Sequence, residues 1–196
     1  MYKSIPVNYD DSLVSLACSV LKRFGAPYTH GTLEDFDKLL AKGYKNVVVM
    51  LFDGMGCAIL EKHKRVVPFL IEHYIRPISS VFPPTTTAAT TSIETGLTPC
   101  EHGWLGWALY FKEVDKNVCL FTNTEFGKDE IAADYPVAKT AIPFDNIETK
   151  IRKVGKQAYF VSKHADIKTD SVQTTCDIVR ELCEKEGEKY IYCYWN

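Results

Sequence analysis

The sequence predicts an α/β fold with three layers, α/β/α, around a largely parallel central sheet. First, Asn46–Phe52 is a continuous apolar run, which is typical of a strand buried on both faces of a parallel sheet. Second, apolar residues at helical spacing precede and follow this run. Third, strand and helix patterns alternate along the rest of the chain. We therefore expect residues 1–196 to form a single α/β domain, with 46–52 as its central strand.

Two helices are expected before the central strand. The first has helical apolar spacing over 13–21, and Asp10 or Asp11 could cap it. The second runs from Thr32, a plausible cap, to Gly43.

Further elements follow the central strand. Helical spacing predicts helices over 57–63 and 172–184. The stretch 123–143 has weak periodicity and is expected to be irregular. Short apolar runs predict strands at 78–82, 118–121, 157–161 and 190–195. The chain stops within the last of these strands, and functional residues of α/β sheets follow the carboxyl ends of strands. We therefore expect an incomplete domain, the N-terminal part of a longer catalytic domain.

Composition limits the class of protein. Apolar residues make up 46% and charged residues 24%, a globular balance, and a net charge of -2 does not favour a nucleic-acid binder. Seven cysteines form no CxxC pair, and the N-terminus has no apolar leader, so a reduced, cytoplasmic setting is expected. No apolar run approaches the roughly 20 residues of a membrane span.

Asp53 is the first candidate site residue. It follows the strongest strand directly, in Phe52-Asp-Gly-Met-Gly56, and a carboxylate at a strand's carboxyl end is well placed for a cation. On its own the segment fits equally well an aspartate that caps the next helix.

A threonine-rich segment, 80–99, is the second candidate. A strand is expected to end at Phe82, and a helix is expected to begin among the threonines and to end near Gly96. Hydroxyl groups would then lie at a helix N-terminus, where amides and the helix dipole favour an anion. On its own this segment is more often a threonine cap followed by a tightly packed helix.

The two segments together resemble the alkaline phosphatase superfamily, and most closely its nucleotide pyrophosphatase/phosphodiesterase branch. The resemblance consists of Phe52-Asp-Gly, Phe82-Pro-x-x-Thr86, Thr95-Gly-Leu-x-Pro99 and His102-Gly103, in this order. It is strong over 47–107 and continues weakly in the strand 190–195. It implies an alkaline phosphatase-like fold.

The resemblance also implies a mechanism. It makes Asp53 a ligand of one of two divalent metal ions, usually zinc. It makes Thr86 both a ligand of the same metal and the nucleophile that attacks phosphorus. Thr86 is preferred to Thr85 and Thr87 because it lies four residues after Phe82. The implied activity is hydrolysis of phosphodiester or nucleotide pyrophosphate bonds in a small-molecule substrate.

The chain departs from this pattern in two ways. The diesterase branch commonly has an asparagine three residues after the nucleophile, and this position is Ala89. The remaining metal ligands of the family have no match, so the two-metal site is expected to be incomplete in this chain. A phosphomonoester, phosphonate or sulfate ester hydrolase, and a catalytically incomplete binding module, therefore stay open as alternatives. Missing strands would leave a sheet edge unpaired, which invites self-association.

Other polar and aromatic candidates are weaker. His164 and Asp166 follow a strand and could mimic a ligand pair, whereas His63 and His73 are expected to be solvated. The resemblance implies a structural role for His102. Trp104 and Trp107 could form an aromatic wall for the base or leaving group, although buried loop anchors are the commoner use of such residues.

Overall fold

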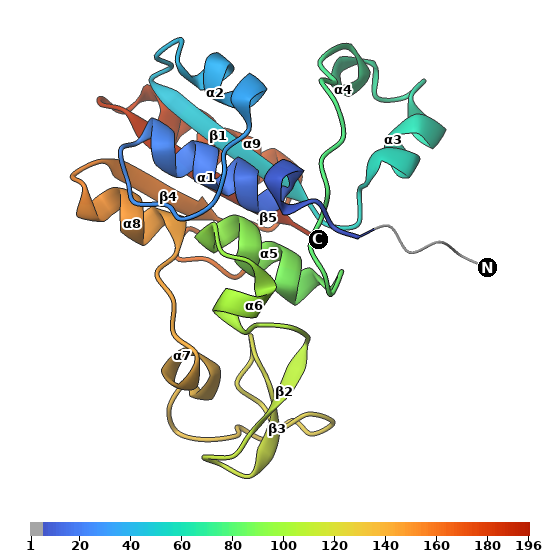
Figure 1. Ribbon diagram of the computed structural model, residues 1–196, viewed down its shortest axis with the longest axis vertical. Coiled ribbons are helices and arrows are strands. Elements are labelled where there is room, and N and C mark those ends of the chain that lie inside the picture. Colours follow the sequence, from blue (N-terminus) through green and yellow to red (C-terminus); the bar gives the residue numbers. More distant parts are fainter. Residues whose placement is uncertain (1–5) are drawn as a thin grey trace. The chain divides into compact units, whose positions relative to one another are not determined.

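The computed structural model describes residues 6–196, which form two compact units that interleave along the sequence (Figure 1). The helical unit consists of the chain up to Gly43 together with Ser79–Val154. The sheet unit consists of Tyr44–Ile78 and Gly155–Asn196. The expectation of a single domain over 1–196 stays a prediction.

A small parallel sheet forms the centre of the sheet unit. Its strands are β1 (Asn46–Phe52), β5 (Lys189–Trp195) and β4 (Gln157–Val161), in the order β1-β5-β4 (Figure 1). Both pairings are parallel, so all three carboxyl ends lie at one edge. The chain is thus a mixed α/β protein with a small parallel sheet, consistent with a partial alkaline phosphatase-like fold.

The central strand is β5, and the expectation that 46–52 would be central is wrong. β1 pairs with β5 on one side, and no other strand among residues 6–196 pairs with it. Tyr190, Ile191 and Tyr192 of β5 are at most 1% exposed, whereas Val48 and Met50 of β1 are 39% and 37% exposed. Apolar content indicates that a segment can be a buried strand, but it does not identify the neighbours of that strand.

Helix α9 (Val172–Glu184) covers part of this sheet. Its Leu182 forms a buried cluster with Val161 of β4 and with Ile191 and Cys193 of β5. The helix begins at a cap in which the Ser171 hydroxyl oxygen accepts the Thr174 N–H at 3.0 Å. The expected bounds of β4, α9 and α3 (Cys57–His63) are confirmed. The short helix α4 (Pro68–Glu72) follows α3.

Two packed helices form the core of the helical unit. Helix α1 (Leu13–Arg23) packs against α5 (Thr86–Thr95), and Val14, Cys18 and Ala88 are buried between them. The remaining helices of this unit are η1 (Tyr9–Asp11, a 3-10 turn), α2 (Glu34–Leu40), α6 (Pro99–His102), α7 (Val137–Ala141) and α8 (Ile147–Lys153).

The first two helices are confirmed, but their expected caps are wrong. Ser12 caps α1, because its hydroxyl oxygen accepts the Val14 N–H at 3.2 Å, while Asp10 and Asp11 form the preceding turn. Helix α2 follows Leu33, and the Thr32 hydroxyl instead donates to the Asp37 carboxylate at 2.7 Å.

A hairpin and an irregular excursion complete the helical unit. Strands β2 (Ala108–Phe111) and β3 (Lys116–Cys119) pair antiparallel, so the strand expected at 118–121 begins two residues earlier and lies outside the parallel sheet. The expectation of a strand at 78–82 is wrong, since this segment forms only an isolated bridge, between Ser79 and Ser12. Residues 123–143 are irregular apart from α7, as expected.

Among residues 6–196 no helix has both the length and the apolar character that a membrane crossing requires.

Candidate active site

Thr86 is the first residue of helix α5, as expected. The preceding residue, Thr85, caps the helix, since its hydroxyl oxygen accepts the Ala88 N–H at 3.2 Å. The same hydroxyl donates to the Leu105 carbonyl at 3.1 Å. The helix ends at Gly96, whose φ of 72° lies in the left-handed region that glycine adopts readily.

The three adjacent threonines have different surroundings. Thr85 uses its hydroxyl in the cap, and Thr87 is 1% exposed, with a buried hydroxyl that has no hydrogen-bond partner among residues 6–196. Thr86 is half-buried and therefore reachable from solvent. Thr86 is thus neither the cap residue nor fully buried, and its expected role as the nucleophile stays a prediction.

The other threonines of α5 are buried. Thr90 and Thr95 are buried, and their hydroxyls donate to the Thr86 and Thr91 carbonyls at 2.9 and 2.7 Å. This back-bonding satisfies polar groups inside the core of the helical unit. The threonine-rich composition of α5 thus reflects packing. Thr86 differs from Thr90 and Thr95 by its position in the first turn of the helix.

Asp53 follows β1 at the carboxyl edge of the parallel sheet and is exposed. Its N–H donates to the Trp195 carbonyl at 2.8 Å, and the Tyr194 hydroxyl donates to its carboxylate at 2.9 Å. Gly56, not Asp53, is the N-cap of α3, and that end has no side-chain cap. The alternative in which Asp53 caps the next helix is therefore wrong.

Tyr194 is a partner of the candidate residue Asp53 that sequence reasoning missed. Tyr194 belongs to β5 and lies 141 residues beyond Asp53 in the sequence. The parallel register places Trp195 opposite Phe52, and this brings Tyr194 beside the residue that follows β1. The pattern of apolar residues in the two segments contains no information about this register.

His164 and Asp166 do not adjoin Asp53. They follow β4 and are exposed, and β5 lies between β4 and β1. Across residues 6–196, no group of three or more His, Cys, Asp or Glu side chains could hold a metal ion. Asp53 and Thr86 belong to different units, so their expected sharing of one metal stays a prediction.

His102 is a buried structural residue, in keeping with the role that the resemblance implies. It is 3% exposed, its Nδ1 accepts the Trp104 N–H at 3.0 Å, and its Nε2 lies 3.0 Å from the Ser92 hydroxyl. Burial lowers the pKa of His102 to about 4, which keeps the imidazole neutral at pH 7. His63 and His73 are exposed, as expected.

A comparison with protein families finds a match for this chain. The family model described as type I phosphodiesterase / nucleotide pyrophosphatase matches residues 47–179, which is more than half of the chain and includes Asp53 and Thr86. No curated protein and no solved structure matches this chain.

Proposed function

This chain belongs to the type I phosphodiesterase/nucleotide pyrophosphatase family, and from that premise we propose a function for it. We propose that the protein hydrolyses phosphodiester or nucleotide pyrophosphate bonds with Thr86 as the nucleophile and Asp53 as a metal ligand. The observation that carries the proposal is the position of Thr86 as the half-buried first residue of α5, inside the region that the family model matches.

The N-terminus of α5 supports a role for Thr86 in phosphoryl transfer. A ten-residue helix has amides at its N-terminus that point away from the helix and a dipole that favours an anion. A phosphoryl group held there lies beside the Thr86 hydroxyl. Thr85 fixes this end of the helix through its cap and its bond to Leu105.

The available donors suit a divalent metal ion. Asp53 offers an exposed carboxylate at a strand end, and Thr86 offers a hydroxyl, both of them oxygen ligands. Family membership implies two such ions, with zinc the expected metal, and Asp53 and Thr86 would provide part of one site. When bound, the ions supply positive charge that stabilises the attacking and leaving oxygens.

The proposed reaction has two steps. The Thr86 hydroxyl gives its proton to water as its oxygen forms a bond to phosphorus and the bond from phosphorus to the leaving oxygen breaks. The departing alkoxide or phosphate takes up a proton from water in return, so no proton is gained or lost in this step. A water oxygen then forms a bond to phosphorus, the bond from phosphorus to the Thr86 oxygen breaks, and a proton of that water restores the Thr86 hydroxyl as the second product leaves. The protein orients Thr86 through the rigid first turn of α5.

The test is turnover by the full-length natural protein. We expect it to hydrolyse bis-p-nitrophenyl phosphate, to lose activity with a chelator and to regain it with zinc. Thr86→Ala should lower kcat by several orders of magnitude, because the nucleophile acts as one unit with the rest of the site. Thr86→Ser keeps a hydroxyl and should retain measurable activity. Asp53→Asn should raise the zinc concentration required for half activity.

Matched controls separate the site from the rest of the surface. Asp134→Asn changes an exposed carboxylate of the helical unit and should leave the zinc requirement unchanged. Full activity of Thr86→Ala with zinc present would refute covalent catalysis by Thr86. Zinc and substrate binding without turnover by the wild-type protein would instead support a non-catalytic binding module.

Ala89 supports a second candidate, hydrolysis of monoesters. Its methyl group, three residues after Thr86 and half-buried in α5, cannot donate a hydrogen bond to a phosphoryl oxygen. We propose that this weakens the preference for diesters. The ratio of kcat/KM for p-nitrophenyl phosphate to that for the diester measures the preference, and Ala89→Asn should shift it towards the diester.

A further inference from the structure

The backbone of Asp53 is held by an extension of the pairing between β1 and β5. The two strands pair in parallel up to Phe52 and Trp195, and the Asp53 N–H then donates to the Trp195 carbonyl at 2.8 Å. Asp53 is therefore attached to the sheet one residue beyond the last pair of strand residues. Its main chain is fixed by β5, although its side chain is exposed.

The register of the two strands also places a hydroxyl beside the Asp53 carboxylate. Leu51 lies opposite Tyr194, so their side chains point to the same face of the sheet. Alternation along the chain brings Asp53, two residues after Leu51, to that face as well. The Tyr194 hydroxyl reaches along this face and donates to Oδ2 of Asp53 at 2.9 Å. Consecutive residues of β5 thus bind both the carboxylate and the backbone of Asp53.

A buried lysine fixes the same register at the other end of β5. Lys189 lies opposite Asn46 and is 0% exposed. Its ammonium donates to Asn46 Oδ1 at 3.1 Å. It also donates to two carbonyls of the preceding turn, those of Lys185 and Gly187, at 2.6 and 2.8 Å. A slip of one residue would turn the side chains of a strand to the other face and would break the bond to Asn46. The contact between the hydroxyl and the carboxylate therefore follows from a fixed register.

The hydroxyl is the informative part of Tyr194. The ring alone suits any half-buried position in a strand, where aromatic residues are common. An ionised carboxylate has about four lone-pair positions, so Asp53 can accept the tyrosine O–H and still bind a cation. Carboxylates that bind metal ions are themselves held by hydrogen bonds of this kind, which orient the ligand.

We propose that Tyr194 is a positioning residue, whose hydroxyl holds the Asp53 carboxylate in the orientation that binds a metal ion. The inference rests on the proposed function, because it takes Asp53 to be a metal ligand. Tyr194 acts through Asp53 and is not itself a ligand.

The test measures zinc binding to the full-length natural protein without substrate, by competition with a chromophoric chelator. The zinc ion of interest is the one whose dissociation constant rises in Asp53→Ala. Tyr194→Phe keeps the ring and removes only the hydroxyl, and it should raise this constant about tenfold, the lower end of the range for such partners. The lower end applies because water can replace the hydroxyl at this exposed contact. At saturating zinc, kcat should return close to the wild-type value, which general damage to the sheet would not allow.

A double variant separates positioning from an effect on the fold. In the Asp53→Ala background there is no carboxylate to hold, so Tyr194→Phe should not change the zinc dissociation constant further. Effects of the two substitutions that multiply would show that the hydroxyl acts through the fold, and would overturn the inference.

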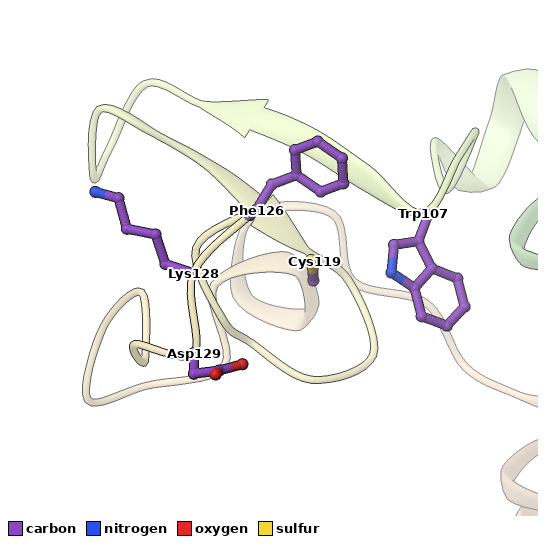
Figure 2. A pocket seen from close by; sticks show the side chains of 6 residues that line it. Trp107, Cys119, Phe126, Lys128 and Asp129 are labelled. Atoms are coloured by element: carbon purple, nitrogen blue, oxygen red, sulfur yellow. The ribbon is translucent and has the colours of Figure 1, made fainter.

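Two controls change a hydroxyl and a carboxylate elsewhere. Tyr159→Phe removes a hydroxyl of β4 in the same sheet, one that donates to Gln157 Oε1 at 3.0 Å. Asp129→Asn neutralises a carboxylate that lines, with Lys128, a pocket of about 280 Å³ in the helical unit (Figure 2). Both variants should bind zinc as the wild type does.

The inference and the proposed function fail in different ways. If Asp53→Ala weakens zinc binding and Tyr194→Phe does not, the inference is wrong and Asp53 remains a metal ligand. If Asp53→Ala binds zinc as tightly as the wild type, the metal role of Asp53 in the proposed function is refuted, and the inference with it.

Discussion

Gly96→Ala should destabilise the helical unit through two effects that the structure separates. Gly96 ends α5 with φ of 72°, and its N–H donates to the Ser92 carbonyl at 2.9 Å. An added Cβ would lie 3.2 Å from Leu21 Cδ1 and 3.4 Å from Cys18 Sγ, both in α1. The substitution therefore strains the backbone and also overfills the contact between α1 and α5.

The expected cost follows from these distances. Placing alanine in the left-handed region costs about 1–2 kcal/mol. Overpacking of a core costs typically about 1–3 kcal/mol, and the lower end applies because the end of the Leu21 side chain can move. The free energy of unfolding should fall by about 2–3 kcal/mol.

Gly25→Ala provides the comparison. Gly25 follows α1 with φ of 69°, and an added Cβ would meet nothing within 4 Å. It should therefore cost about 1–2 kcal/mol from backbone strain alone. Urea unfolding followed by circular dichroism measures both variants. If Gly96→Ala costs no more than Gly25→Ala, the close packing of α5 on α1 is refuted.

Two further predictions concern pH. Burial lowers the pKa of His102 to about 4, so the unfolded chain binds more protons between pH 6.5 and 4. Stability should fall by up to about 3 kcal/mol as the pH falls through this range, and His102→Gln should flatten the profile. Burial raises the pKa of Glu148 to about 7, so here the folded protein binds more protons than the unfolded chain between pH 4.5 and 7. The free energy of unfolding should therefore fall by up to about 3 kcal/mol as the pH rises from 4.5 to 7. Glu148→Gln should be the more stable protein at pH 8. Urea titrations at pH 4.5, 6 and 8 measure both effects, and profiles parallel to the wild type would contradict them.

Individual helices and strands could be predicted from the sequence where the spacing of apolar residues was clear. The bounds of β4, α3 and α9 follow from apolar periodicity interrupted by polar turns. The caps were less predictable, because Ser12, Asp11 and Asp10 are all good capping residues and backbone geometry selects among them. The segment 78–82 has strand-like residues, but it pairs only at Ser79.

Long-range pairing could not be predicted. The central position of β5 and the bond from Tyr194 to Asp53 both depend on the register between strands that are about 140 residues apart. The helical position of Thr86 was accessible from the sequence, because the prolines before it and Gly96 after it mark the ends of α5. The joint action of Asp53 and Thr86 rests on family membership and stays a prediction.

The order of the strands has a consequence for synthesis of the protein. β1 obtains its neighbour only when β5 has emerged from the ribosome, and Asn46 and Lys189 are 143 residues apart. At about 5–20 residues per second, this delay lasts roughly 7–29 s. Within residues 6–196, the apolar Val47–Phe52 segment has no other β-partner for that time, while residues 79–154, most of the helical unit, are made in between. Apolar surface and unpaired strand edges that are exposed during synthesis promote aggregation, so β1 needs protection until β5 is made.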